Sequence, residues 1–377
     1  MAWVNGKSIY NTARNLWHGF RRQTHPASFP RDIDITVTKA CNLRCTFCIS
    51  YGSLGGQRWM PFDRYERIAE KLFPSALRVY ICSGGEPLLY RHIRDALILA
   101  KSYATLTSMT SNGMLLDQDV SNWLVDDQSL HRLVLSFDGA RENTLEQIRR
   151  GANYHTILEN VKYLSSLKLK RKKAYPLIKI RYVVMKSNIK EFPEIFEIAA
   201  RHGIGEVEVQ YLNAPNASLF QQSLFNDRIL AEETFSDARV KAKEFGIKLY
   251  LPPAIVQSKR VKKCFYPWQF CQIDTDGSIR FCYHSWPQRL GFFDDGFEKV
   301  WNGESYSKIR SSVDSEKPYY PYCRYCPTRL GEGVREAHDQ ALHPESYFIP
   351  GLEHLQIPFN KRQEENIRSF KELREKS

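Results

Sequence analysis

The 377-residue chain has no run of about 18 apolar residues, so its sequence excludes a conventional membrane-spanning helix. Its first residues contain no apolar stretch of the kind that forms a secretory signal peptide. Internal repeats and low-complexity tracts are also lacking. Apolar residues make up 42% of the chain and charged residues 25%, a balance too hydrophobic for a disordered protein. At roughly 150 residues per domain, we expect a cytoplasmic globular protein of two or three domains.

Acidic residues are absent from residues 1–31, which hold five basic ones. Two further basic clusters, at 168–173 and 259–263, carry five and four positive charges. The net charge of the whole chain is only +12, so the remainder is close to neutral. Such localised charge argues against an evenly basic nucleic-acid-binding surface. The acid-free start is compatible with an organelle transit peptide and with an N-terminal helix that docks on the core.

From residue 32 onward, short apolar and β-branched runs alternate with helical patterns, as parallel βα units require. Apolar residues spaced as on one helix face occur around Tyr65–Leu72, Ile157–Leu164 and Phe192–Ala199. Six strand–helix units are too few for a closed eight-unit barrel. The pattern predicts an α/β fold, a partial (β/α)6 TIM-like barrel, with its chemistry at the carboxyl ends of the strands. We expect strands at 33–37, 77–82, 106–110, 133–137, 178–185 and 207–212.

The nine cysteines indicate reduced thiols rather than a disulfide framework, because the chain shows no export signal. Three of them, Cys41, Cys45 and Cys48, stand in a C-x3-C-x2-C spacing directly after the first expected strand. Three thiolates so close together can hold one metal centre. A zinc ion would need a fourth ligand, whereas a 4Fe–4S cluster held by three thiolates keeps one iron open.

This cysteine spacing resembles the cluster motif of the radical S-adenosylmethionine (radical SAM) superfamily. The resemblance implies that the open iron binds the amino and carboxylate groups of S-adenosylmethionine (SAM). One electron then cleaves SAM to methionine and a 5′-deoxyadenosyl radical, which takes a hydrogen atom from substrate. Phe47 matches the aromatic residue that in the family packs near the adenine.

Further motifs fall where the family has SAM contacts. Gly84, Gly85, Glu86 and Pro87 follow the second expected strand and resemble the GGEP motif, in which glycines admit close backbone approach and the glutamate offers a charge for the ammonium. The resemblance also assigns SAM contacts at the ends of later strands. These are Ser111 and Asn112, Ser136 and Asp138, and an arginine of I-R-R-G, Arg149 or its neighbour Arg150; Gln210, Tyr211 and Asn213 would face the same mouth. Each residue alone is also an ordinary cap or turn residue of a βα fold.

A second cysteine set resembles a SPASM or twitch domain. Cys264-x12-Gly277-x4-Cys282 fits the start of that pattern, and Cys323-x2-Cys326 fits its end. The resemblance implies a β-hairpin and a CxxC turn around an auxiliary 4Fe–4S cluster with four protein ligands. Because no cysteine follows Cys326, the shorter one-cluster form is favoured; a four-cysteine zinc ribbon is the alternative. We expect Cys271 and Cys82 to be packing residues, although Cys271 is also a candidate ligand.

The expected organisation is a basic arm or helix at 1–31, a radical SAM core at 32–250, an auxiliary-cluster domain at 251–330 and a helical tail at 331–377. The expected function is a radical SAM oxidoreductase or maturase that modifies a peptide, a protein side chain or a small molecule. No peptide-leader-binding domain fits in the 40 residues before Cys41. The alternatives are a small-molecule, sugar-like dehydrogenase or epimerase, an RNA-modifying member, and a non-catalytic iron–sulfur or zinc protein. We expect an electron donor such as flavodoxin or ferredoxin as partner, and we assign no general acid or base.

Overall fold

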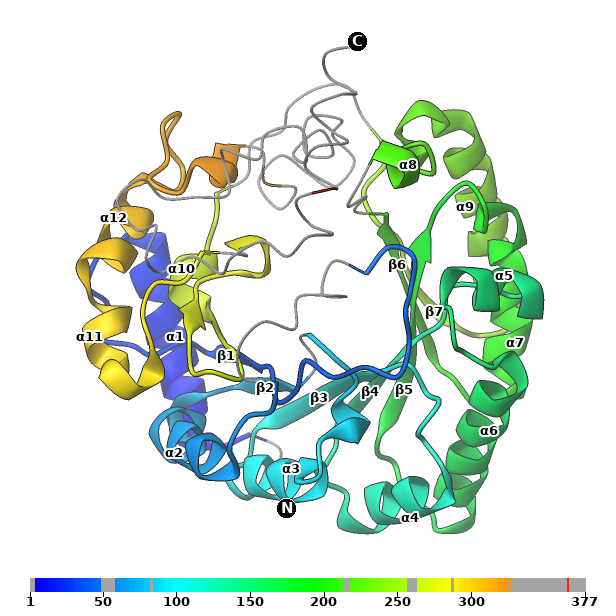
Figure 1. The fold of residues 1–377 in the computed structure, drawn as a ribbon, viewed down its shortest axis with the longest axis horizontal. Coiled ribbons are helices and arrows are strands. Elements are labelled where there is room, and N and C mark those ends of the chain that lie inside the picture. Colours follow the sequence, from blue (N-terminus) through cyan, green and yellow to red (C-terminus); the bar gives the residue numbers. More distant parts are fainter. Residues whose placement is uncertain are drawn as a thin grey trace.

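A single curved sheet organises the molecule (Figure 1). The computed structural model describes residues 4–48, 58–81, 84–212, 217–255, 263–285, 288–324, 326 and 365. Within these ranges the sheet has nine strands in the order β7-β6-β5-β4-β3-β2-β1-β8-β9. The strands are β1 (Asp32–Ile35), β2 (Arg78–Ile81), β3 (Leu106–Ser111), β4 (Arg132–Ser136), β5 (Leu177–Val184), β6 (Glu206–Tyr211), β7 (Lys248–Tyr250), β8 (Phe270–Ile273) and β9 (Ile279–Arg280).

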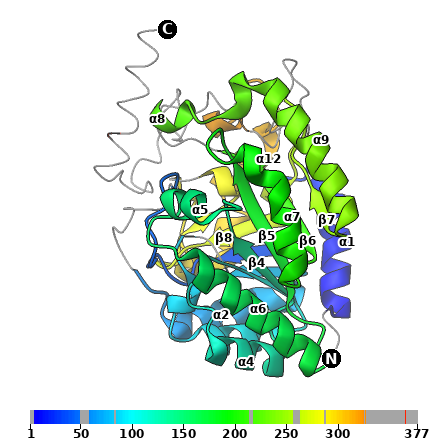
Figure 2. The ribbon, with the colours of Figure 1, turned by 90° about the vertical axis from the view of Figure 1, so that its right-hand side faces the viewer.

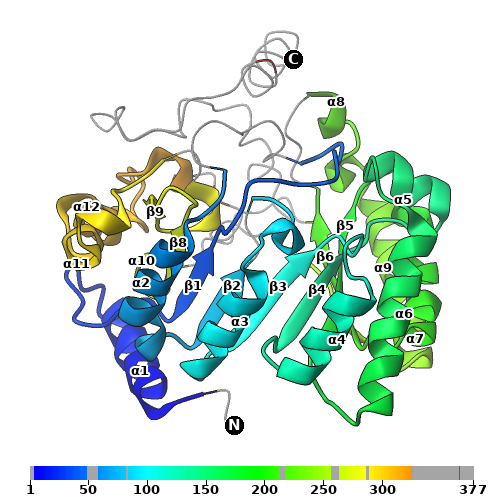
Figure 3. The same cartoon turned by 60° about the horizontal axis from the view of Figure 1, so that its bottom comes forward.

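Helices cover the outer side of this open sheet (Figures 1 and 3). The α-helices are α1 (Gly6–Phe20), α2 (Phe62–Leu72), α3 (Ile93–Ser102), α4 (Gln118–Asp127), α5 (Glu142–Ile148), α6 (Tyr154–Lys170), α7 (Ile195–Arg201), α8 (Ala217–Phe220), α9 (Arg228–Glu244), α10 (Tyr266–Gln269), α11 (Phe297–Trp301) and α12 (Glu304–Ser312). Short 3-10 helices are η1 (Phe73–Ser75), η2 (Pro87–Leu89), η3 (Ile189–Glu194), η4 (Leu224–Asn226), η5 (Tyr283–Ser285), η6 (Phe293–Asp295) and η7 (Pro321–Arg324). None of the helices in the described part of the chain combines the length and apolar character needed to cross a bilayer.

The predicted α/β class with a parallel, partial barrel is confirmed, and all six predicted strands form. The predicted faces Tyr65–Leu72 and Ile157–Leu164 are the buried faces of α2 and α6. The third predicted face divides between η3 and α7, because Pro193 lies inside the 3-10 turn and lacks the N–H of a regular helix. Asn153 caps α6 by accepting a hydrogen bond from the Thr156 amide, which fixes where this helix starts.

The sheet extends beyond the six predicted strands at both edges. β7 adds in parallel to β6, so the chain up to residue 250 belongs to the sheet. β8 adds in parallel to β1, with Cys271 opposite Ile33, and β9 returns antiparallel to β8. The expected hairpin of the second cysteine set is therefore continuous with the barrel sheet. Because β1 lies between β2 and β8, all four of its residues are buried.

The N-terminal helix α1 packs against α10 and η1, on the flank of the four-cysteine region. Arg310 of α12 is 1% exposed and donates hydrogen bonds to the carbonyls of Pro267, Thr24 and Trp301. Arg310 therefore connects α10, α11 and the segment that follows α1. The predicted helical tail at 331–377 lies outside the described residues, apart from Glu365.

Candidate functional site

The first candidate site is the loop after β1, which carries three cysteines. Two main-chain hydrogen bonds fasten this loop to the end of α5: Arg44 N donates to Arg150 O at 2.8 Å, and Thr46 N donates to Ile148 O at 2.9 Å. The loop therefore lies over the I-R-R-G segment that the sequence singled out. The cysteines it presents are Cys41, Cys45 and Cys48.

The three thiols have graded access to solvent. Cys41 is exposed, Cys48 is half-buried and Cys45 is buried. Burial raises the pKa of the Cys45 thiol to about 11, although the positive charge of Arg149 lowers it. The neighbouring Cys48 and Cys41 sulfurs raise this pKa further. Thiols so close to one another ionise together only when a cation binds them. The donor set suits an iron–sulfur cluster with one side facing out.

A glycine turn places the second motif against this loop. Glu86 N donates to Ala40 O at 2.7 Å, directly before the first cysteine. A Cβ on Gly85 would lie 2.2 Å from the same Ala40 oxygen, so only glycine fits there. Gly84 has φ +118°, a conformation that other residues rarely adopt. The glycines therefore allow two loops from adjacent strands to touch through their backbones.

Glu86 joins the same motif to the end of β3. Its carboxylate accepts hydrogen bonds from Ser111 Oγ at 2.9 Å, Asn112 N at 2.8 Å and Leu88 N at 3.2 Å. The side chain is 2% exposed, and burial raises its pKa to about 7 despite these donors. Pro87 follows at the first turn of η2, where its missing N–H costs nothing. The Glu86 carboxylate thus connects the loop after β2 to the end of β3. Its contact with the ammonium group of SAM stays a prediction.

Arg149 links the cysteine loop to the end of β4. Its Nη2 lies 2.5 Å from Asp138 Oδ2, and its Nη1 donates to Cys45 Sγ at 3.7 Å. Arg149 is 8% exposed and Asp138 is fully buried, with Asp138 Oδ1 also accepting from Val183 N at 2.7 Å. Arg149 Nε is buried and has no hydrogen-bond partner. One donor therefore remains for an anion at this site.

Phe47 lies beside this arginine, with the Arg149 guanidinium 5.7 Å from its ring centre. The ring packs on a small apolar cluster that contains Ile148, Met185 and Leu212. Met185 and Leu212 follow β5 and β6, and the sequence analysis assigned them no role. Their position directly after two strands of the barrel is the signal that could have identified them.

The remaining predicted mouth residues differ in placement. Asn112 Nδ2 donates to Asn42 Oδ1 at 2.8 Å, so this side chain braces the cysteine loop. Tyr211 is 8% exposed and its hydroxyl donates to Pro253 O at 3.1 Å. Ser136 and Gln210 are half-buried at the carboxyl ends of β4 and β6. Asn213 lies outside the described residues.

Four cysteines of the second set line one small cavity: Cys264, Cys282, Cys323 and Cys326. Each is between 6% and 7% exposed. Aromatic side chains complete the wall, among them Tyr266, Phe281 and Tyr322. The segments just before α10, just after β9, and within and just after η7 thus bring four thiols to one cavity, the number that a fully protein-ligated 4Fe–4S cluster needs.

Hydrogen bonds hold two of these cysteines in place from outside the cavity. Cys264 N donates to Asp314 Oδ1 at 2.9 Å, and Cys282 O accepts from Ser285 Oγ at 2.7 Å. Arg22, just after α1, donates to Cys264 O and forms an ion pair with Asp314. The N-terminal segment therefore helps to position the second cysteine set.

The other two cysteines do not line this cavity. Cys271 is fully buried in β8, and burial strongly raises the pKa of its thiol. Cys82 lies outside the described residues. Among the residues that the structure describes, no three His, Cys, Asp or Glu side chains are grouped as ligands of a metal ion would be. Four thiolates on one zinc ion each lie about 2.3 Å from the metal, so they are close to one another. A four-iron cluster separates its thiolate ligands more widely.

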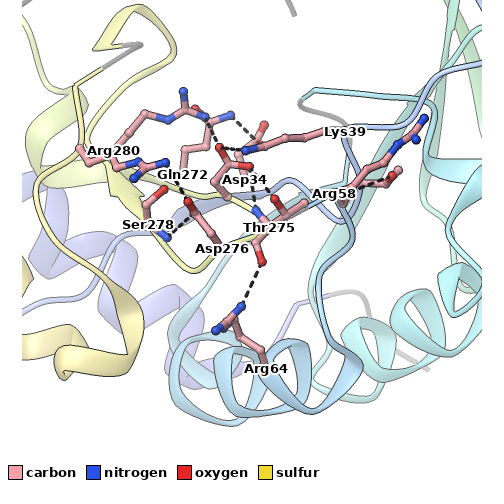
Figure 4. Close-up of polar contacts among 12 residues, drawn as sticks. Asp34, Lys39, Arg58, Arg64, Gln272, Thr275, Asp276, Ser278 and Arg280 are labelled. Atoms are coloured by element: carbon pink, nitrogen blue, oxygen red, sulfur yellow. Dashed lines mark hydrogen bonds and ion pairs between the residues drawn. The ribbon is translucent and has the colours of Figure 1, made fainter. Parts of the chain in front are cut away.

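A buried polar network joins β1 and the segment after it to β8, β9 and the turn between them (Figure 4). Lys39 Nζ is 3.1 Å from Asp274 Oδ2, and Arg280 Nη2 is 3.7 Å from the same oxygen. Gln272 Nε2 donates to Asp34 Oδ1 at 3.3 Å across the β1–β8 seam. Lys39 stands two residues before Cys41, and Arg280 stands two residues before Cys282. One shared carboxylate therefore ties the two cysteine-bearing segments together.

Comparisons with known proteins agree with this geometry. The model of the radical SAM superfamily matches residues 35–199, and that of an iron–sulfur cluster-binding (SPASM) domain matches residues 264–327. The chain is 28% identical to a probable GTP 3′,8-cyclase of Pyrococcus horikoshii over 67% of this chain and 83% of that protein. It is 22% identical to the probable GTP 3′,8-cyclase of Sulfurisphaera tokodaii over 70% and 84%, respectively.

Two solved structures share the fold. Streptococcus suis SuiB bound to S-adenosylmethionine has a TM-score of 0.62 and 19% identity, over 82% of this chain and 74% of SuiB. Native anSMEcpe with bound AdoMet has a TM-score of 0.61 and 16% identity, over 92% and 98%. The two matched family models imply 4Fe–4S clusters and SAM as cofactors, and both cysteine sets supply suitable donors. The chain therefore carries a radical SAM domain followed by a C-terminal SPASM domain, and it is an enzyme.

Proposed function

We propose that this enzyme cleaves SAM at the Cys41, Cys45 and Cys48 loop and oxidises a polar substrate. These three thiols would hold a 4Fe–4S cluster, which would supply the electron that cleaves SAM to methionine and a 5′-deoxyadenosyl radical. That radical would then take a hydrogen atom from a substrate carbon. The observation that carries the proposal is the convergence of that loop with Glu86 and Arg149. Three strand ends thereby meet at one set of thiols.

The chain's own residues bind and orient SAM in this proposal. The Gly84–Glu86 turn offers backbone carbonyls to the ammonium, since Gly85 leaves no side chain in the way. Arg149 Nε, buried without a partner, is the donor for the carboxylate. Phe47 and Met185 offer an apolar surface to the adenine. Ser136, at the end of β4, is placed for the ribose.

The second cysteine set supports an oxidative outcome. Four thiols would complete the coordination of a 4Fe–4S cluster, so no iron would remain open to substrate. We therefore assign Cys264, Cys282, Cys323 and Cys326 to a centre that exchanges electrons. A flavodoxin- or ferredoxin-like donor in the cytosol, where thiols stay reduced, fits this chemistry.

The inner face of the sheet favours a polar small molecule as substrate. Side chains alternate along β5: Tyr182 contacts Phe192 on the helix side, so Lys179 and Arg181 point to the other side. Both are paired with Glu208 of β6, at 2.9 and 3.2 Å. The sequence relatives named as GTP 3′,8-cyclases support the same class. A peptide is the alternative, and SuiB has been crystallised with its precursor peptide.

The test is anaerobic reconstitution followed by an iron count and a SAM cleavage assay. We expect about eight irons per chain, four for each cluster, and release of 5′-deoxyadenosine with a strong reductant. Tightly bound zinc without SAM cleavage would refute the proposal. Deuterated candidate substrates, polar small molecules and short peptides, then identify the substrate class by transfer of deuterium into 5′-deoxyadenosine.

A further inference from the structure

Helix α1 buries its polar side chains, the reverse of an ordinary surface helix. Asn11 Nδ2 donates to the carbonyls of Phe29 and Ser75, at 3.0 and 2.9 Å. Asn15 Nδ2 donates to Phe29 O and to Trp268 O. Both asparagines are at most 8% exposed. Hydrogen bonds from buried asparagines to backbone carbonyls therefore help to dock this helix on the protein.

The apolar side chains of α1 consequently face outward. At 100° per residue they occupy one continuous sector of about 120° along the full helix. Five of the thirteen exposed large hydrophobic residues in the described part of the chain lie in this helix. They are Ile9 (58% exposed), Tyr10 (65%), Leu16 (44%), Trp17 (58%) and Phe20 (72%).

A row of cations borders one edge of this sector. Lys7, Arg14 and Arg21 are spaced seven residues apart, so they follow the helix axis on one side. The Arg14 guanidinium lies 5.5 Å from the Tyr10 ring centre, and that of Arg21 lies 5.8 Å from the Trp17 ring centre. No acidic residue occurs in residues 1–31. A partner surface that complements α1 must therefore offer an apolar region to the exposed rings and negative charges to the row of cations.

We infer that α1 docks this enzyme on the surface of an anionic phospholipid bilayer. A helix with Trp, Phe and Leu on one face and a cationic border lies in the plane of the lipid headgroups. The headgroup phosphates meet Lys7, Arg14 and Arg21, and the rings enter the acyl boundary. Figure 2 shows α1 along an outer edge of the molecule, on the side away from α5 and α8. The cysteine loop packed on the end of α5 is thus left clear of the bilayer.

Vesicle flotation of the full-length reconstituted enzyme tests this inference. We expect binding to vesicles of phosphatidylcholine mixed with phosphatidylglycerol, weakened by high salt. The double variant Trp17→Ser/Phe20→Ser should lower the partition coefficient between vesicles and water at least about tenfold, since two rings no longer enter the acyl boundary of the bilayer. Arg14→Gln/Arg21→Gln should weaken binding to these vesicles and reduce its salt dependence, since Lys7 alone of the three cations remains.

The matched control is Leu169→Ser/Ile229→Ser, which removes two side chains that are 81% and 73% exposed on α6 and α9. It should bind vesicles like the wild type. Unchanged SAM cleavage and thermal midpoint show that each variant is folded. The inference is wrong if the wild type does not float, or if the α1 variant floats equally well. It is also wrong if light scattering shows a dimer that the Trp17→Ser/Phe20→Ser variant dissociates without any vesicle binding, since a second copy then covers the face.

Discussion

The two cysteine sets are built differently. In the first, three thiols come from one eight-residue loop, and the outermost, Cys41, is exposed. Its surroundings are charged, with the Arg149–Asp138 pair and the Glu86 carboxylate close by. In the second, four buried thiols come from segments up to 62 residues apart, and aromatic rings surround them. The first arrangement leaves one thiol exposed to solvent, and the second encloses its four thiols.

This difference indicates a division of labour. An open site needs charges and hydrogen-bond donors to orient a polar ligand, and their burial is destabilising unless each is paired. A closed site needs ligands and an apolar wall, because the exclusion of solvent is one of the factors that set the potential of a cluster. The Lys39–Asp274–Arg280 network links the two cysteine-bearing segments.

The largest expected effect separates the two sites directly. Cys45→Ala should reduce 5′-deoxyadenosine formation to background, because it removes a ligand from the open site. Cys323→Ala/Cys326→Ala should lose about four irons and keep SAM cleavage with a chemical reductant. Iron analysis and chromatography of the reaction products measure both.

Cys271→Ala is the control for the closed site, since its thiol does not line the cavity. It should keep the iron content of the wild type. Loss of about four irons from this variant would make Cys271 a ligand and contradict the four-cysteine assignment. Loss of SAM cleavage from Cys323→Ala/Cys326→Ala would show that the two sites do not act separately.

Removing the charge of Arg149 should be the next largest effect. In Arg149→Gln the Asp138 carboxylate stays buried without its cation, which typically costs about 3–5 kcal/mol. The double variant Arg149→Gln/Asp138→Asn should recover much of this stability and yet bind SAM poorly, because the buried donor is absent. Thermal unfolding under argon and SAM equilibrium binding distinguish the two effects. Equal SAM affinity in the wild type and the double variant would exclude a SAM contact by Arg149.

Much of the open site could be predicted from sequence because its signals are local. The cysteine spacing and the Gly84–Pro87 turn depend on neighbours in the chain. The hydrogen-bond partners of Asp138 and Glu86 could not be predicted, since each carboxylate bonds to donors that only the folded sheet brings near. The same holds for β8, four residues long, which pairs with β1 across more than 230 positions.

The orientation of helix α1 could not be predicted, for another reason. Periodicity predicts that an apolar stripe faces the core, and here backbone carbonyls of distant segments take that position. The side chains of Asn11 and Asn15 donate hydrogen bonds to these carbonyl oxygens, and no sequence pattern reveals this pairing. The expectation of a docked N-terminal helix nevertheless agrees with the structure.

A smaller effect should follow from Gly85→Ala. The added Cβ would lie 2.2 Å from Ala40 O, so the two loops must separate. We expect a loss of about 3 kcal/mol, the upper part of the range for overpacking, together with weaker SAM binding. Gly205→Ala is the matched control, because no heavy atom lies within 4 Å of its Cβ position. An equal response of both variants would mean that the close approach at Gly85 is unimportant.

The smallest expected effect is a pH dependence of the thermal midpoint that arises from His18 of α1. His18 in α1 shares a hydrogen bond of 2.7 Å with Ser28 Oγ, and its pKa is lowered by burial and by the positive charges of Arg14 and Arg310. Since the folded protein holds this proton less tightly than the unfolded chain, the stability contribution is complete above the ordinary pKa of 6.5 and decreases as the pH falls below it. The thermal midpoint of the wild type should therefore drop between pH 7.5 and a slightly acidic pH by more than that of His18→Asn. Parallel curves for the two proteins would show that His18 does not cause this pH dependence.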